Sequence, residues 1–267
     1  MFEEDWNFLK KNFQDAVKKV NKDTAAIKIL ERKIAHSQRV LQNGQLIIRR
    51  NIPIISSEHK TLAETTLLFH DIGRFQEVVL SHQNQAMGEW GKRYDHGHIG
   101  AEILSQTPKY NHPAIILPVR HHGHIIEDFY NDAEYQNLPI EQKTAAETAI
   151  KIVRDADKLD LYYLHKKENI LEHDVFFTNL SDELKLSPPS KIVVEQFLSR
   201  KSINHSTIRS MSDRILGCLS WQFDFNYPIT AQMYIEKGYQ AHLLALFYRY
   251  CPDNNFINIL KKFIQQI

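Results

Sequence analysis

A histidine and an aspartate stand side by side at the end of an apolar run, in the segment FHDIGR of residues 69–74. An imidazole nitrogen and a carboxylate oxygen both bind transition metals. Adjacent residues on a helix point about 100° apart, so His70 and Asp71 cannot chelate one ion as an i,i+4 pair would. They can bracket one ion from two sides, or the carboxylate can bridge two ions. Either arrangement needs further ligands, because a His-Asp pair alone is common by chance and would be a solvated helix end.

Further candidate ligands occur in three segments that are rich in histidine or aspartate. The chain has 14 histidines against 9 glycines and 9 prolines, and several lie in DHGH (95–98) and RHHGH (120–124). The third segment is RDADKLD (154–160), in which Asp155 and Asp160 are either surface carboxylates or partners that orient a histidine. A single histidine, His36, lies in HSQRV, and one histidine on a helix is more often solvated than a ligand. The number of histidines is a weak signal, so their order along the chain carries the information.

Apolar residues at three- and four-residue steps predict two helices before the His-Asp pair. The first is expected over residues 2–20. The second is expected to run from the cap residue Asp23 to about Leu41, with His36 on it, before Asn43-Gly44 ends it. Residues 45–57 are expected to be an irregular buried connector.

The His-Asp pair is expected at the C-terminal end of a third helix. Thr61 and Glu64 have the spacing of a capping box at its start, and Gly73 stands where a helix would stop. Residues 76–93 lack a clear period and are expected to be a loop or a short helix over the site.

A long helix is expected from about Pro139 to residue 165, with Asp157 on it and a buried stripe that includes Tyr163. No segment after it has residues with an evident chemistry. Helical patterns in this C-terminal part occupy residues 191–220, 240–249 and 256–264.

Taken in order, these segments resemble the signature of the HD superfamily of metal-dependent phosphohydrolases. Ligands in that superfamily come in the order His, His-Asp, Asp, with further histidines before the last Asp in dinuclear members. The resemblance covers about residues 27–166. It implies a metal-ligand set of six residues: His36, His70, Asp71, His96, His122 and Asp157.

Local matches carry the resemblance. The first ligand is followed by Arg39-Val40, as is common in HD proteins, and HGHIGAEIL from His96 resembles a stretch of the HD-GYP family in which His98 has no counterpart. VRHHGH resembles VRYHHE of the same family, which puts His122 at the ligand position, with His121 as the alternative. The resemblance to HD-GYP ends there, because no GYP follows, and neither a third metal nor cyclic-di-GMP specificity is implied.

The resemblance implies an all-α fold, an HD-domain bundle of about five ligand-bearing helices with a C-terminal helical extension. The expected division is an N-terminal helix in residues 1–22, the HD domain in residues 23–168, and an extension in residues 169–267 packed on the HD domain.

The implied function is hydrolysis of a phosphomonoester or phosphodiester, with a small, nucleotide-like phosphorylated substrate and two divalent ions (Mn, Fe, Co, Ni, Zn or Mg). Asp71 would bridge the ions and hold the activated water. Arg74 stands where many dinuclear relatives carry Lys and would contact phosphate oxygens; the alternative is a cation that the dipole favours at a helix C-terminus.

Two other functions are compatible with the same residues. HD-fold diiron oxygenases use the same six-ligand pattern, and dioxygen consumption by an iron-loaded sample would separate them from hydrolases. An HD fold that senses nucleotides would bind without turnover, although an intact ligand set argues against a decayed site.

The composition limits the partners. In 267 residues, 43% hydrophobic and 24% charged, the formal net charge is +1 without a basic block, so no extended nucleic-acid surface is expected. Cys218 and Cys251 are far apart, which fits a reducing compartment. No segment of ~20 apolar residues and no leader pattern occurs, so a cytoplasmic protein without membrane contact is expected. A homo-oligomer is compatible with the sequence.

Overall fold

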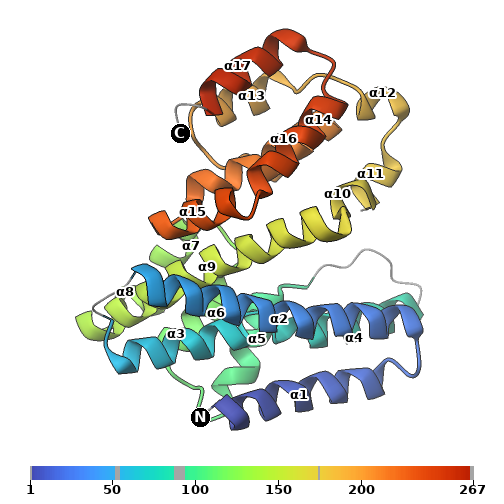
Figure 1. Ribbon diagram of the computed structural model, residues 1–267. Helices are drawn as coiled ribbons and strands as arrows, with labels where there is room; N and C mark the ends of the chain where they lie inside the picture. The colour runs from blue at the N-terminus through green and yellow to red at the C-terminus, as the bar shows by residue number, and fades with distance from the viewer. Residues whose placement is uncertain (1, 52–54, 87–93, 174, 265–267) are drawn as a thin grey trace. The chain divides into compact units, whose positions relative to one another are not determined.

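A computed structural model describes residues 2–51, 55–86, 94–173 and 175–264. The chain divides into two compact units, Met1–Asp160 and Leu161–Ile267. Every regular element in the described residues is a helix, so the predicted all-α class is confirmed (Figure 1). No helix in this part of the chain combines the length and the apolar character that a membrane crossing requires.

The first unit contains the helices that carry the His-Asp segments. They are α1 (Phe2–Lys19), α2 (Thr24–Asn51), α3 (Ser57–Phe69), α4 (Gly73–Ala86), α5 (His96–Ser105), α6 (Pro113–His121), α7 (Ile126–Tyr130), α8 (Ala133–Gln136) and the larger part of α9 (Ile140–Glu168). Helix α5 packs against α4 and α6, and α3 packs against α2 and α6. The ends of α3, α5 and α6 therefore lie close together.

An aromatic and aliphatic core holds α3 in place. Phe69 is fully buried, and its ring contacts Phe8 and Tyr110 edge-on, with centroids 5.7 and 4.7 Å away. Ile72 and Phe75, on the far side of the His-Asp pair, are also buried. Apolar anchors on both sides of residues 70 and 71 thus fix the backbone that presents the imidazole and the carboxylate.

Helix α2 does not end at Asn43-Gly44, as predicted, but continues to Asn51. A Cβ atom at position 44 would lie 2.3 Å from Leu67 Cδ1, so Gly44 is the point where α3 packs closely on α2. The expected irregular connector is therefore wrong for residues 45–51. Residues 52–54 lie outside the described residues.

The start of α3 also differs from the prediction. Ser56 is the N-cap, and its side chain accepts a hydrogen bond from the backbone N–H of His59. The predicted capping box is wrong, since Glu64 lies inside the helix, where its carboxylate accepts a hydrogen bond from Gln45 Nε2 at 3.2 Å.

The loop or short helix expected over residues 76–93 is a regular helix as far as Ala86, and residues 87–93 lie outside the described residues. Gly73, expected to stop the third helix, is instead the first residue of α4, because α3 has already ended at Phe69.

The second unit begins with the last residues of α9. Its other helices are α10 (Ile170–His173), α11 (Val175–Asn179), α12 (Asp182–Lys185), α13 (Lys191–Leu198), α14 (Met211–Ser220), α15 (Pro228–Glu236), α16 (Tyr239–Tyr250) and α17 (Asn254–Ile264). The helical pattern over 191–220 is split into α13 and α14, whereas the helices predicted at 240–249 and 256–264 are confirmed as α16 and α17. Tyr162, rather than the predicted Tyr163, is the buried tyrosine of α9, and its ring contacts Tyr234 at 4.5 Å.

Candidate metal centre

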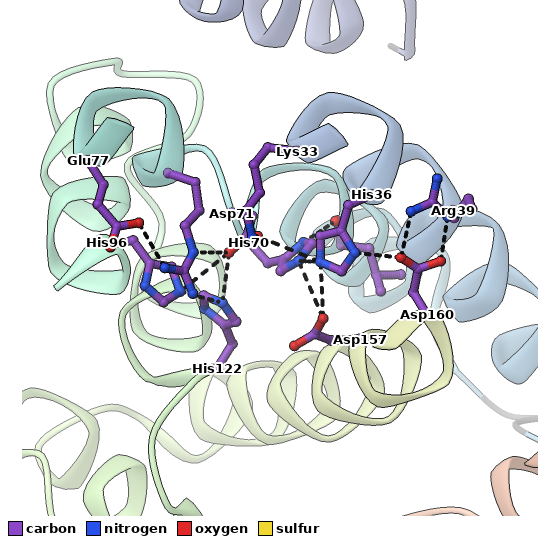
Figure 2. Close-up of polar contacts among 12 residues, drawn as sticks. Lys33, His36, Arg39, His70, Asp71, Glu77, His96, His122, Asp157 and Asp160 are labelled. Atoms are coloured by element: carbon purple, nitrogen blue, oxygen red, sulfur yellow. Dashed lines mark hydrogen bonds and ion pairs between the residues drawn. The ribbon is translucent and has the colours of Figure 1, made fainter. Parts of the chain in front are cut away.

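The six residues singled out in the sequence come from five helices of the first unit and meet in one cluster, the candidate metal centre (Figure 2). They are His36 of α2, His70 and Asp71 at the end of α3, His96 at the start of α5, His122 at the end of α6 and Asp157 of α9. Four of them are 95% or more buried, which suits ligands and would be costly for uncompensated polar groups.

One half of the centre contains His36, His70 and Asp157, whose ligand atoms lie within 4.8 Å of one another. The Nε2 atoms of the two histidines are 3.1 Å apart, and Asp157 Oδ1 is 3.1 Å from His36 Nε2. His70 Nδ1 donates to the carbonyl oxygen of Leu67 at 2.9 Å, so the neutral ring carries no proton on Nε2. The lone pair of this nitrogen therefore faces a second imidazole nitrogen, so a proton or a metal ion must lie between the two nitrogens.

The other half of the centre has the same construction. The Nε2 atoms of His96 and His122 are 3.2 Å apart, and His122 Nδ1 donates to the carbonyl oxygen of Val119 at 2.8 Å. Asp71 Oδ1 lies 3.3 Å from His96 Nε2 and 3.4 Å from His122 Nε2. Two imidazoles and a carboxylate thus converge on one point, and the donor set fits a divalent transition metal.

Asp71 links the two halves. Its Oδ1 faces His96 and His122, while its Oδ2 lies 3.6 Å from His36 Nε2. In Figure 2 the carboxylate lies between the two groups of histidines. Each half of the centre therefore receives one oxygen of the same carboxylate, the placement that a bridging ligand needs.

Two cations flank Asp71, one on each side. Lys33 Nζ is 3.3 Å from Oδ2, and Arg74 Nε is 3.4 Å from Oδ1. Arg74 also donates from Nη1 to Glu77 at 2.8 Å. Sequence reasoning missed Lys33, although it stands one helical turn before His36 and could have been found from that spacing.

Asp160 orients His36. Its Oδ2 is 2.6 Å from His36 Nδ1, and Arg39 donates to both of its oxygens, from Nε at 2.6 Å and from Nη2 at 3.0 Å. This carboxylate is thus a partner that holds a histidine of the centre in one orientation. Asp155 is fully buried, so the expectation of a surface carboxylate is wrong for both residues. Arg39, of the Arg39-Val40 pair that follows His36 in the sequence, thus fixes the carboxylate that orients His36.

The two adjacent histidines of RHHGH have different surroundings. His122 points its Nε2 at Asp71, whereas His121 Nε2 is 2.8 Å from Asp132 Oδ2, away from the centre. The geometry therefore favours His122 over the alternative His121. The side chain of His98 is 60% exposed, and its Nε2 lies 3.9 Å from Asp95 Oδ2.

Burial sets the protonation of two histidines of the centre. It lowers the pKa of His70 to about 4 and that of His96 to about 3, so both rings are neutral at pH 7, as metal ligands must be. Burial of Asp71 opposes its ionisation, but the charges of Lys33 and of the protonated His36 outweigh this effect and hold the pKa of Asp71 well below the usual range.

His36 behaves differently. Its burial disfavours the charged ring, but hydrogen bonds to Asp157 and Asp160 outweigh this effect and raise its pKa to about 9. In the ion-free protein at neutral pH, a proton on His36 therefore supplies the positive charge that the first half of the centre requires.

Metal binding is expected to displace this proton. Below pH 9 the binding of an ion in the half that contains His36 should release about one proton from His36, so the affinity of this half should rise about tenfold per pH unit between pH 7 and 9 and then level off. Titration calorimetry in buffers of different ionisation enthalpy measures the released proton directly. A pH-independent affinity over this range would contradict the expectation.

The fold and the site define a class: an all-α protein whose buried histidines and aspartates, contributed by five helices, surround a shared carboxylate. Residues 34–162 match the family model of the HD domain, and this part of the chain is an HD domain. The chain thus carries an HD domain, a domain that indicates a superfamily of metal-dependent hydrolases. Searches of curated proteins and of solved structures gave no match.

Proposed function

We propose that this protein is a metal-dependent phosphohydrolase that cleaves a phosphomonoester or phosphodiester, with a small nucleotide-like substrate. The observation that carries the proposal is the shared carboxylate of Asp71, which offers one oxygen to each of two histidine groups. Divalent ions bound there would supply an activated water as nucleophile and would polarise a phosphate oxygen. Nitrogen and oxygen donors without a thiolate suit Mn, Fe, Co, Ni or Zn, while Mg is an option for an oxygen-rich substrate complex.

The residues around Asp71 support chemistry on a phosphate. Arg74 lies in the first turn of α4, where the helix dipole disfavours a cation, so the alternative of a cation at a helix C-terminus does not apply. Asp71 and Glu77 hold the guanidinium beside the second half of the centre, and its side chain is 30% exposed. A guanidinium in this position can donate two hydrogen bonds to phosphate oxygens as they gain charge.

Replacement of Arg74 by alanine is expected to lower kcat about 100-fold, or ~3 kcal/mol, because a donor to the developing charge is lost. Bound metal should not change. Arg74→Lys should recover part of the rate, since the ammonium keeps the positive charge but lacks the paired N–H donors of the guanidinium. Arg49→Ala, at an exposed position of α2, is the matched control. Unchanged turnover in Arg74→Ala would remove this residue from the mechanism.

The activity itself is tested by screening nitrophenyl phosphates, mononucleotides, dinucleotides and cyclic nucleotides with protein loaded with Mn, Co, Ni, Fe or Mg. The proposal expects hydrolysis that depends on the metal. Dioxygen uptake by iron-loaded protein without hydrolysis would assign it to the diiron oxygenases instead. Tight binding of an unchanged nucleotide would assign it to the sensing modules.

A further inference from the structure

Two His-Gly-His segments each send one histidine into the candidate metal centre and one away from it. Residues 96–98 open α5, and residues 122–124 follow α6. His96 and His122 meet inside the centre, as described above. The rings of the other two, His98 and His124, also lie near one another, with centroids 6.2 Å apart.

Asp95 serves both of these outer histidines. Its Oδ2 is 3.0 Å from His124 Nε2 and 3.9 Å from His98 Nε2. Its Oδ1 accepts a hydrogen bond from the backbone N–H of His98 and so caps α5, which fixes the carboxylate in place. One carboxylate oxygen thus lies next to two imidazole nitrogens, an arrangement that parallels Asp71 beside His96 and His122.

His121 completes a triangle of rings. Its centroid is 5.7 Å from that of His124 and 6.4 Å from that of His98. Histidine pairs within the candidate metal centre have centroids 5.0 to 5.1 Å apart, so the outer rings are about 1 Å further apart. The side chain of His98 is 60% exposed and can turn to close this gap.

One ring nitrogen of His121, Nδ1, makes no hydrogen bond to the described residues. The residue is only 7% exposed, and its buried Nδ1 has no hydrogen-bond partner among the described residues. Its Nε2 donates to Asp132 Oδ2 at 2.8 Å, and Arg120 Nη1 holds that carboxylate at 3.1 Å. A neutral imidazole that donates from Nε2 keeps a lone pair on Nδ1. Metal-binding histidines commonly donate one ring N–H to a carboxylate and offer the lone pair of the other nitrogen to the ion, and His121 has this arrangement.

We propose that Asp95, His98, His121 and His124 bind a single zinc ion, at a site separate from the candidate metal centre. The site uses none of the six residues of that centre. Three imidazole nitrogens and one carboxylate oxygen complete a tetrahedral zinc shell and leave no open position, which is typical of a structural site. A zinc ion at this site would join the start of α5 to the segment after α6, and would thereby hold the backbone of His96 and His122 in place.

The segment after α6 is already anchored from α9. Arg154 Nη1 donates to the carbonyl oxygen of His122 at 3.2 Å and also to that of His124. The backbone of the second His-Gly-His segment is thus held on one side, while the His124 side chain, 33% exposed, stays accessible to an ion from solution.

Zinc stoichiometry tests the proposal. Wild-type protein saturated with Zn²⁺ and freed of excess ion by gel filtration should retain about one more zinc per chain than the double variant His98→Ala/His124→Ala, since two of four ligands are then missing. His173→Ala, at an exposed histidine of the second unit, should match the wild type. Equal zinc content in wild type and double variant would overturn the proposal. Loss of more than one ion would do so too, because the outer histidines would then serve the inner centre.

The nitrogen that His121 uses gives a second readout. In two-bond ¹H–¹⁵N spectra, Zn²⁺ should shift His121 Nδ1 to the range of a metal-bound nitrogen, while Nε2 keeps its proton on the Asp132 side. The same spectra of the double variant should show no such shift. An unchanged Nδ1 in zinc-saturated wild type would overturn the assignment of His121 as a ligand.

Discussion

Asp71→Ala should abolish hydrolysis and remove the bound metal ions. Both halves of the candidate metal centre lose an oxygen in this variant, since Oδ1 lies beside His96 and His122 while Oδ2 lies toward His36. The variant should therefore lack the metal-activated water that acts as the nucleophile, rather than only a group that positions it. We expect kcat/KM to fall by about four orders of magnitude or more, equivalent to ~5 kcal/mol.

Asp71→Asn separates the loss of charge from the loss of volume. The amide has nearly the same shape, but it is a weak ligand and cannot balance Lys33 and Arg74, so this variant should also lack metal and activity. Glu102→Gln, at an exposed carboxylate of α5, is the control and should behave as wild type. Elemental analysis and circular dichroism show whether metal is lost from a folded protein. An Asp71→Asn protein that retained wild-type metal content would contradict the bridging role.

Gly73→Ala should damage both the stability and the centre. A Cβ atom at this position would lie 2.0 Å from the carbonyl oxygen of His96 and 2.6 Å from the backbone nitrogen of Gly100. Both are backbone atoms that cannot rotate aside, so the start of α4 and the start of α5 must separate. We expect a loss of about 3 kcal/mol in the free energy of unfolding, at the upper end for one added methyl group.

The displacement acts directly on metal binding, because His96 is the first residue of α5 and lies 3.3 Å from Asp71. Gly73→Ala should therefore bind less metal even under conditions where it is folded. Gly123→Ala is the matched control, since the nearest atom to its added Cβ, on the His96 ring, would be 3.5 Å away, an ordinary contact. Denaturant unfolding and metal analysis of both variants test the expectation. A Gly73→Ala protein as stable as Gly123→Ala would show that the helices separate at little cost.

Short motifs allowed the chemistry to be predicted from the sequence. The order of His36, the His-Asp pair and Asp157 led to a cluster that the fold brings together, because each motif lies on a helix whose apolar stripe is readable. The choice between His121 and His122 could not be made from helical periodicity, since the two are adjacent. It depends on Asp132, eleven residues further along, which holds His121 away from the centre.

Features that depend on contacts between distant segments could not be predicted. Asn43-Gly44 has the local sequence of a helix end. In the fold, however, the helix continues, and the absence of a side chain at Gly44 makes room for the side chain of Leu67 from α3. Gly73 has the position of a helix stop, yet its absent side chain is what lets α4 approach α5. The backbone freedom of the two glycines predicts helix ends, whereas in the fold the glycines leave room for a neighbouring helix.

The positions of the ligands within their helices also bear on how the centre exchanges its ions. His36 and Asp157 lie inside the long helices α2 and α9, whereas His96 and His122 lie at the ends of the short helices α5 and α6. Helix ends open by local fluctuations of a few residues, but the middle of a long helix opens only when much of that helix unfolds. We therefore expect hydrogen exchange to be faster around His96 and His122 than around His36. We expect ions to exchange faster at the half that contains His96 and His122 than at the half that His36 and Asp157 hold from within long helices.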